Sequence, residues 1–347
     1  MTIDRSPEDS VDVCIIGSGP AGALTAYPIA SRGYKVVVLE AGKRFNIKNQ
    51  EQRISRMERA LRPAHGPLEV WEMGGERDAY TSSGQHYYSL NRKRVKGIGG
   101  TSLHWGGTVW RMHPGDFETR SRYGYGEDWP IGYQDLKHYY RKAEEEIGVA
   151  GATDNLFGPP RESNFPMPAF PKSYSDGILE DACEELGINV HSVPRAQYSV
   201  PYDGRNQCVG YGTCSPICPQ GARYSSVHHI RKAESESARV IDQAPVQRLE
   251  HDESGEQITE AVYATPDGST HRQTARQFVV ACGGVETPRL LLNSKSSVYP
   301  NGLANSSGTV GQYFMEHPSV LITGRFPQRT NQHRIGFRTM GSQQFYG

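Results

Sequence analysis

VDVCIIGSGPAG, at residues 11–22, combines an apolar segment with a glycine-rich turn. The apolar segment, Val11 to Ile16, has the composition of a strand that is buried on both faces of a parallel sheet. A helix of small residues is expected from about Pro20 to Ser31, followed by a second buried strand from Val36 to Leu39. These elements predict a βαβ unit at the amino terminus.

The glycines of this turn, together with an acidic residue after the second strand, have the spacing of a dinucleotide-binding fingerprint. Gly17 permits the tight turn, Gly19 lets the backbone approach a pyrophosphate, and Gly22 lets the helix pack closely on the strand. Glu40 ends the second strand, where it can accept the ribose hydroxyls and would repel the 2′-phosphate of NADP. The motif predicts a dinucleotide site but does not distinguish FAD from NAD.

Length and charge limit the classes of function. At 347 residues the chain is long enough for about two domains of roughly 150 residues each. Lysine plus arginine and aspartate plus glutamate number 38 each, so there is no excess of positive charge to attract nucleic acid or an anionic bilayer. Met1 to Ser10 lacks the pattern of an export signal, and no apolar run approaches the roughly 20 residues that span a bilayer. We expect no nucleic-acid partner and no membrane span.

A second glycine motif follows at Gly97-Ile-Gly99-Gly100-Thr101-Ser102-Leu-His104-Trp105-Gly-Gly107. Small residues at 99–102 leave backbone amides accessible to a flavin and to phosphates. With the first motif, this stretch resembles the glucose-methanol-choline (GMC) oxidoreductases, a family that uses FAD and whose second glycine motif lies against the flavin. Later landmarks of the family occur in the same order along nearly the whole chain: Asp128-Trp-Pro-Ile131, Ala281-Cys-Gly283-Gly-Val-Glu-Thr-Pro-Arg289, Val310-Gly311 and Met315-Glu-His-Pro318.

The resemblance implies a set of FAD-contacting residues. It places a backbone contact to adenine at Val246 and puts His104 beside the flavin, where some members of the family attach FAD covalently and others hold it without a bond. The full set that it implies is Gly17, Gly19, Gly22, Glu40, Gly99, Gly100, Thr101, Ser102, His104, Trp105, Val246 and Gly283.

The fold class expected from these patterns is α/β. We expect a Rossmann-like FAD-binding domain of the glutathione-reductase type and a truncated α+β substrate domain built on an antiparallel sheet. Amphipathic helices are predicted from Gly132 to Gly148 and near Ser175 to Leu186. Strands are predicted at Glu260 to Tyr263 and Gln277 to Val280, with a tight turn at Asp267-Gly268.

Four segments are expected along the chain. The first part of the FAD-binding domain takes residues 1–150, in which residues 43–95 are expected to be irregular with short helices. Residues 151–235 form an inter-lobe segment that carries a cysteine cluster, because 151–172 is rich in proline, glycine and asparagine. Residues 236–318 return to the FAD-binding domain, and 319–347 begin the strands of the substrate domain.

Half of the 6 cysteines lie in one short window. Cys208, Cys214 and Cys218-Pro219 match the bacterial ferredoxin run, with Tyr211 in place of its second cysteine. Three thiolates with one ligand position missing favour a 3Fe-4S cluster. The alternatives are a zinc site that takes His228 or His229 as a fourth ligand, and structural thiols or a disulfide. We expect the remaining thiols, Cys14, Cys183 and Cys282, to be buried and structural.

The cysteine spacing also resembles the flavoprotein subunits of membrane-bound glucose, gluconate, sorbitol and fructose dehydrogenases. That branch of the family implies oxidation of a CH–OH group of a sugar, sugar acid or polyol, with hydride transfer to flavin N5. Electrons would then pass through a 3Fe-4S cluster to a cytochrome or quinone. The implied partners are a small chaperone-like subunit and a cytochrome c subunit, and the implied location is periplasmic or membrane-associated through them. A cytoplasmic relative without such partners is the alternative.

The catalytic base is not identified by the sequence. In the family, a histidine near the carboxyl terminus, paired with a second histidine or an asparagine, takes the hydroxyl proton, and no such pair is visible here. We therefore expect this chain to be the amino-terminal part only. His317, His228 and His229 are expected to be structural. Two other functions stay open: a truncated module that binds FAD without turnover, and an oxidase that passes electrons to oxygen and needs no cysteine cluster.

Overall fold

The computed structural model describes residues 4–45, 47, 49–60, 71, 94–315, 320–330 and 336–346. The chain divides into two compact units. Unit 1 comprises Met1–Ile47, Trp71–Leu103 and Ser225–Glu316, and unit 2 comprises Lys48–Val70, His104–Tyr224 and His317–Gly347. No described helix is long and apolar enough to cross a bilayer. His317 lies outside the described residues.

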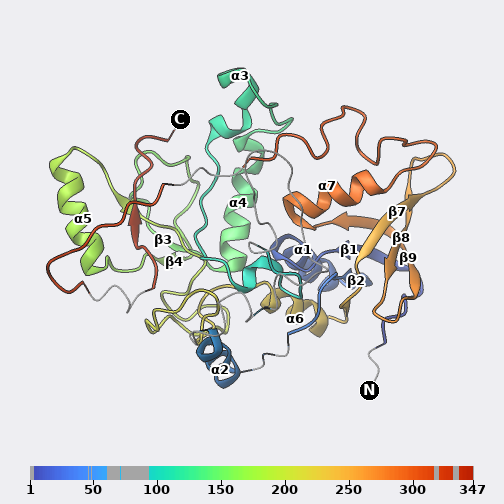
Figure 1. Ribbon diagram of the computed structural model, residues 1–347, viewed down its shortest axis with the longest axis horizontal. Coiled ribbons are helices and arrows are strands. Elements are labelled where there is room, and N and C mark those ends of the chain that lie inside the picture. The colour runs from blue at the N-terminus through green and yellow to red at the C-terminus, as the bar shows by residue number, and fades with distance from the viewer. Residues whose placement is uncertain are drawn as a thin grey trace. The chain divides into compact units, whose positions relative to one another are not determined.

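Unit 1 is built on a six-stranded sheet with the order β6-β2-β1-β9-β8-β7. β1 pairs in parallel with both β2 and β9, and β2 pairs in parallel with β6. β8 runs antiparallel to both β7 and β9, and these three strands lie side by side in Figure 1. The strand bounds are β1 Val11–Ile16, β2 Val36–Leu39, β6 Arg239–Ile241, β7 Val246–His251, β8 Ile258–Ala264 and β9 Thr270–Val280. The α/β class and the amino-terminal βαβ unit are therefore confirmed.

Helices cover both faces of this sheet. On one face, α1 (Pro20–Ala30) and α6 (Val227–Ser235) pack together over Ile15 of β1. On the other, α7 (Gly283–Asn293) packs with Cys14 and Ile16. Because neighbouring residues of β1 point to opposite faces, this strand is apolar at nearly every position.

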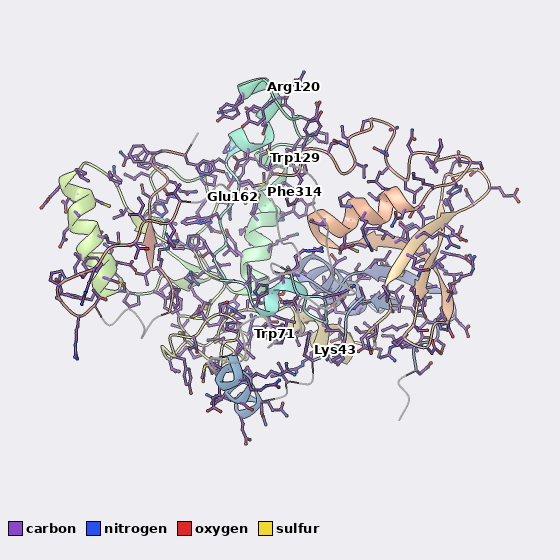
Figure 2. The ribbon with its side chains drawn as sticks, viewed as in Figure 1. Lys43, Trp71, Arg120, Trp129, Glu162 and Phe314 are labelled. Atoms are coloured by element: carbon purple, nitrogen blue, oxygen red, sulfur yellow. The ribbon has the colours of Figure 1, made fainter. Side chains whose placement is uncertain are left out.

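Unit 1 also includes a short aromatic contact near the second glycine motif. The rings of Phe45 and Trp71 meet edge to face with their centroids 5.1 Å apart, and Nζ of Lys43 lies 5.6 Å from the centroid of Phe45. Figure 2 labels Lys43 and Trp71. Trp71 is buried.

Unit 2 contains the two amphipathic helices expected from the sequence, α4 (Tyr133–Ile147) and α5 (Tyr174–Glu185). The N–H of Gly132 donates to Asp135 (2.8 Å) at the start of α4, and Gly148, with φ +71°, ends that helix. The shorter helices are α2 (Gln50–Ala60) and α3 (Thr119–Tyr123), with a 3-10 turn, η5, at Pro114–Phe117.

The paired strands in the described part of unit 2 are short. β3 (Ala150–Gly151) runs parallel to β4 (Met167–Pro168), and β5 (His191–Ser192) runs antiparallel to β10 (Met340–Gly341). Residues 320–330 belong to no helix or strand. The backbone N–H of Thr339 donates to Asp176 at the start of α5 (2.8 Å), which fixes the carboxyl-terminal segment against the helix.

Candidate functional site

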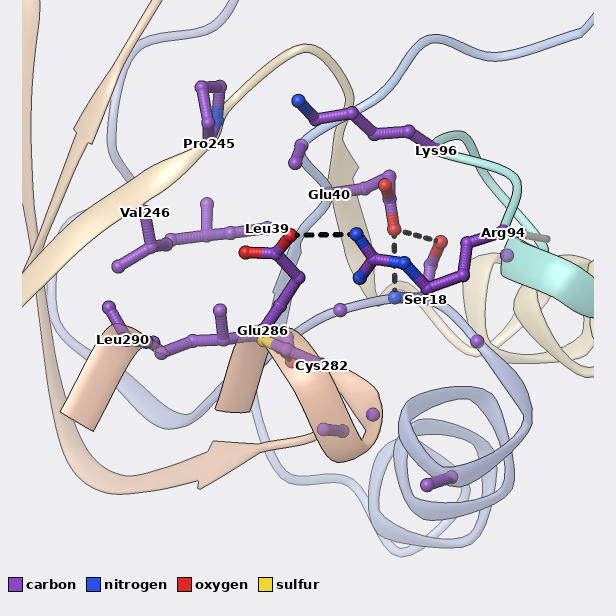
Figure 3. Close-up of a pocket in the computed structure, with 18 of the residues that line it drawn as sticks. Ser18, Leu39, Glu40, Arg94, Lys96, Pro245, Val246, Cys282, Glu286 and Leu290 are labelled. Carbon is purple, nitrogen blue, oxygen red and sulfur yellow. Dashed lines mark hydrogen bonds and ion pairs between the residues drawn. The ribbon is translucent and has the colours of Figure 1, made fainter. Parts of the chain in front are cut away.

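A cavity of about 380 Å³ opens at the carboxyl ends of β1, β2 and β9 in unit 1. In the sheet, β1 lies between β2 on one side and β9 on the other. The strand order changes direction at β1, and open parallel sheets bind ligands at such a position. Figure 3 shows the polar side chains around it. Those labelled include Ser18, Glu40, Arg94, Lys96 and Glu286.

The first glycine turn is shaped by close backbone contacts. Gly17 has φ +101°, and a Cβ there would lie 2.6 Å from the carbonyl oxygen of Ala281. A Cβ at Gly22 would lie only 1.9 Å from the carbonyl oxygen of Gly17, so α1 can approach β1 only with glycine at this position. Gly22 therefore packs the helix and does not line the cavity.

Gly19 has the opposite environment. It lines the cavity, and a Cβ there would meet no atom within 4 Å. It is followed by Pro20 at the first position of α1, whose first turn carries no acidic residue. The free N–H groups of a helix amino terminus therefore face an open space that would take a diphosphate.

Glu40 is buried at the end of β2, as the fingerprint predicts. Its Oε2 accepts hydrogen bonds from Oγ and N–H of Ser18 (2.6 and 3.0 Å), and its Oε1 accepts one from the N–H of Gly42 (2.8 Å). Burial raises the pKa of Glu40, and these hydrogen bonds together with the charge of Lys96 offset part of that rise. The carboxylate is oriented by its neighbours, and the lone pairs that remain can accept ribose hydroxyls.

The second glycine motif packs directly on the first. The backbone N–H of Gly99 donates to Ser18 Oγ (3.2 Å), and a Cβ at Gly100 would lie 3.1 Å from Cα of Gly19. Gly100 and Thr101, in the 3-10 turn η4 (Gly100–Leu103), line the cavity. Gly99 and Ser102 are not among its lining residues.

Ser102 instead stabilises the turn through hydrogen bonds. Its Oγ donates to the carbonyl of Gly99 (2.6 Å) and accepts from the N–H of Ser226 (2.9 Å). Ser226 Oγ also donates to the Gly99 carbonyl (2.8 Å). Two buried serines thus fix the geometry of the motif.

Two predicted cofactor residues lie on the remaining walls. Val246 opens β7, pairs with Tyr263 of β8 and lines the cavity. Gly283 lines it at the start of α7, with φ +78°, and a Cβ there would meet no atom within 4 Å. The structure thus brings together around one cavity Gly17, Gly19, Glu40, Gly100, Thr101, Val246 and Gly283.

The charged rim of the cavity was missed by the sequence analysis. Arg94 Nη2 lies 3.1 Å from Glu286 Oε1, and Arg289 Nε donates to Glu286 Oε2 (2.8 Å). Arg94 stands in the arginine-rich stretch at residues 43–95 that was expected to be irregular, and Lys96 follows directly after it. The only available signal was a basic run directly before the second glycine motif.

His104 and Trp105 belong to unit 2, since the division between units falls after Leu103. There they contact the segment that carries the cysteines. Ser215 Oγ donates to the carbonyl of His104 (3.0 Å), and Trp105 Nε1 donates to the carbonyl of Tyr224 (2.8 Å).

The three cysteines of the window lie in unit 2, where two of them, Cys208 and Cys214, contact the side chain of Gln197. Gln197 is fully buried, and its Nε2 lies 3.1 Å from Cys208 Sγ and 3.9 Å from Cys214 Sγ. Cys214 and Cys218 are buried, and Cys214 is within electrostatic reach of both other thiols. The six cysteines all lie in the described part of the chain, and none of them forms a disulfide there.

Two buried arginines flank these thiols. Burial raises the pKa of Cys214 to about 11, and the charges of Arg195 and Arg223 act against that rise. Burial lowers the pKa of each arginine to about 10, and the nearby thiols act against that fall. In the described part of the chain, no three His, Cys, Asp or Glu side chains are arranged to hold a single metal ion.

Comparison with known proteins agrees with these observations. A family model described as GMC oxidoreductase matches residues 79–319, and a model described as FAD dependent oxidoreductase matches residues 12–76. The fructose dehydrogenase large subunit of Gluconobacter japonicus is 36% identical over 322 residues, which cover 90% of this chain and 59% of the relative. The gluconate 2-dehydrogenase flavoprotein of Pantoea cypripedii is 25% identical over 357 residues, covering 92% and 58%.

Other relatives and solved structures extend the comparison. The 2-methyl-1,2-propanediol dehydrogenase of Mycolicibacterium austroafricanum is 29% identical over 328 residues, covering 91% of this chain and 58% of the relative. A crystal structure of formate oxidase superposes with a TM-score of 0.53 at 19% identity, covering 84% of this chain and 48% of that one, a likeness that concerns the fold. The chain spans less than two thirds of the length of these relatives.

Proposed function

Because this chain belongs to the GMC oxidoreductase family, we propose that it forms the FAD-binding part of an enzyme that oxidises a CH–OH carbon of a sugar, sugar acid or polyol. The observation that carries the proposal is the cavity at the carboxyl end of β1. It combines an open helix amino terminus at Gly19 with an oriented carboxylate at Glu40. These are the two features that a dinucleotide requires, one for its diphosphate and one for its ribose.

Each part of FAD has a matching set of residues. The backbone from Gly17 to Ala21 would hold the diphosphate, Glu40 would accept ribose hydroxyls, and the backbone at Val246 would contact adenine. Gly100 and Thr101 would lie toward the flavin, and Gly283 lines the same cavity. His104 and Trp105 complete the proposed set, and His104 is either a covalent attachment point or a neighbour without a bond. When bound, FAD supplies the acceptor for a hydride.

We further propose that Cys208, Cys214 and Cys218 hold a 3Fe-4S cluster. A cluster bonds each thiolate to a different iron, so its ligands spread more widely than those around one ion. Three thiols support this assignment over a single zinc ion, because two of them contact Gln197 and two are buried beside arginines. Such a cluster would supply one-electron transfer between a two-electron flavin and a haem or quinone acceptor.

Partners and location follow from the same proposal. Two of the similar proteins are named as a large subunit and a flavoprotein of sugar or sugar-acid dehydrogenases. We propose a small chaperone-like subunit and a cytochrome c subunit as partners, and a periplasmic or membrane-associated location through them, with a cytoplasmic enzyme as the alternative. No described histidine is assigned as the catalytic base.

The first test is cofactor content and substrate reduction. Purified protein is expected to carry FAD, and anaerobic addition of fructose, gluconate or sorbitol is expected to bleach the flavin absorbance. Folded protein that takes up no added FAD would refute the proposal as a whole. If the protein binds FAD but no member of this substrate class bleaches the flavin absorbance, it would be a binding module without turnover.

The second test concerns the cysteines. Cys214→Ser is expected to lose iron and sulfide, whereas Cys183→Ser, which changes a thiol of helix α5 outside the cluster, is expected to keep both. If Cys214→Ser still reduces an artificial acceptor at the wild-type rate after substrate addition, the electrons do not pass through this site. That result would favour the oxygen-using oxidase.

A further inference from the structure

Two short segments of unit 2 pair next to the cysteines. Gln197 and Arg223 face each other across an antiparallel bridge, flanked by hydrogen bonds from Tyr198 N–H to Ala222 O (2.9 Å) and from Tyr224 N–H to Ala196 O (2.8 Å). Directly opposed residues share a face, and so do residues two apart on one strand. Arg195, Gln197 and Arg223 therefore lie on one face, and Tyr198 and Tyr224 on the other.

The first of these faces is the one that meets the thiols. Gln197 contacts Cys208 and Cys214, and Arg223 Nη1 donates a hydrogen bond to the backbone carbonyl of Cys214. Arg195 interacts electrostatically with Cys208 and Cys214, and Arg223 does so with Cys214 and Cys218. Each of the three thiols thus has a guanidinium nearby.

Apart from the like charge of Arg223, the remaining neighbours of Arg195 are neutral. Its Nη1 donates to Thr108 Oγ1 (3.2 Å), its Nη2 donates to the carbonyl of Gly106, and its guanidinium lies 4.1 Å from the centroid of Phe337. Among the described residues Arg195 forms no ion pair with a carboxylate, although only 4% of it is exposed. A buried cation without an anionic partner is strongly unfavourable. The position of Arg195 is therefore suited to the negative charge that the cysteines carry as thiolates.

We propose that Arg195 and Arg223 are the fixed counter-charges of the thiolate site and set the reduction potential of the cluster held there. This inference rests on the proposed cluster and deepens it. Reduction by one electron, which the flavin would donate, adds a negative charge to a centre that is already anionic through its thiolates. Positive charge fixed nearby in a buried site stabilises the reduced form, because net charge and solvent exposure are what tune such centres.

Arg205 provides a matched control on the other face. Its guanidinium lies 4.2 Å from the ring centroid of Tyr198 and 5.7 Å from that of Tyr224, and it pairs with Asp203 (3.4 Å). It is also largely buried, with 9% of its side chain exposed. Arg205→Gln thus removes a buried guanidinium from the same unit without touching the thiol side.

The experiment is a redox titration of the holoenzyme, followed through the paramagnetic signal of the oxidised cluster. Arg195→Gln and Arg223→Gln are each expected to lower the equilibrium constant for reduction at least about tenfold, which is about 59 mV for a one-electron couple. Arg205→Gln is expected to leave the constant unchanged. Arg195→Lys and Arg223→Lys, which keep the charge, are expected to recover most of the loss.

The outcomes separate this inference from the proposal beneath it. Wild-type protein without iron and sulfide would refute the cluster itself. A cluster that is present with equal potentials in wild type, Arg195→Gln and Arg223→Gln would overturn only the role of the arginines, as would lysine variants that shift as far as the glutamine variants. The glutamine variants could also lose iron. In that case, a wild-type iron content in the lysine variants supports the counter-charge role, and loss of iron from the lysine variants as well overturns it.

Discussion

Ser18 Oγ lies 2.6 Å from Oε2 of Glu40, to which it donates a hydrogen bond. Ser18 Oγ also accepts a hydrogen bond from the N–H of Gly99 (3.2 Å). One hydroxyl therefore joins the first glycine turn, the end of β2 and the second glycine motif. The cavity is held in shape before any cofactor arrives, which lowers the ordering cost of binding.

Removing the charge of Glu40 should weaken FAD binding. Glu40→Gln keeps the shape of the side chain but replaces charged acceptors for ribose hydroxyls, each worth about 1.5–3 kcal/mol. We expect the dissociation constant for FAD to rise about 10- to 100-fold, measured by flavin fluorescence. Glu234→Gln, which alters a partly exposed carboxylate paired with Arg44 in the same unit, is the control and should not change it. Equal affinity in Glu40→Gln and wild type would refute the assignment.

The raised pKa of Glu40 also predicts how stability depends on pH without FAD. Burial raises this pKa above its ordinary value of 4.5, so the folded chain binds the proton more tightly than the unfolded chain. The contribution of Glu40 to the free energy of unfolding is therefore full below pH 4.5 and is lost as pH rises through the folded pKa. Urea unfolding at a series of pH values should show this decline in wild type. The difference from Glu40→Gln isolates it, and parallel profiles would contradict it.

A methyl group at Gly22 should destabilise unit 1. Its Cβ would lie 1.9 Å from the carbonyl oxygen of Gly17, so α1 would have to move away from β1. We expect Gly22→Ala to lower the free energy of unfolding by roughly 1–3 kcal/mol, as overpacked sites do. Gly177→Ala, in helix α5 with no atom within 4 Å of its Cβ, should be neutral or slightly stabilising. The packing role is wrong if the two variants have equal midpoints in thermal unfolding.

Glu144 should be the main acid-sensitive carboxylate of α4. It accepts hydrogen bonds from Nε of Arg111 (2.8 Å) and Nη1 of Arg161 (2.9 Å). Burial alone would raise the pKa of Glu144, but these arginines outweigh it and hold the pKa below 4.5. Its contribution to stability is therefore present above pH 4.5 and is lost as pH falls through the lowered pKa.

Glu144→Gln tests this ion-pair network. It leaves the buried Arg111 without its anion and should cost about 3–5 kcal/mol in the free energy of unfolding. Glu145→Gln, which breaks the exposed pair with Arg141 on the same helix, should cost less than about 0.5 kcal/mol. Chemical denaturation at neutral pH compares them, and a cost for Glu144→Gln as small as that of the control would contradict the role of the network.

Much of unit 1 could be predicted from local patterns. The segment at residues 11–39 has strand and helix periods that need no distant partner to be recognised, and Gly17, Gly19 and Glu40 do meet at one cavity. β9 was placed only in part, because Thr270–Arg276 is mostly polar, whereas the end of the strand at residues 278–280 is apolar. The charged rim at Arg94, Lys96 and Glu286 could not be predicted, since it joins residues far apart in the chain.

The βαβ unit, the two glycine motifs and the spacing of the three cysteines follow from the order of residues, because turns, helices and strands depend on neighbours a few positions away. Tertiary structure alone decided that Ser18 connects both motifs to Glu40, and that Gln197 with two buried arginines faces the thiols. Those contacts depend on which faces of segments far apart in the chain pack together. This packing cannot be derived from the pattern of neighbouring residues in the sequence.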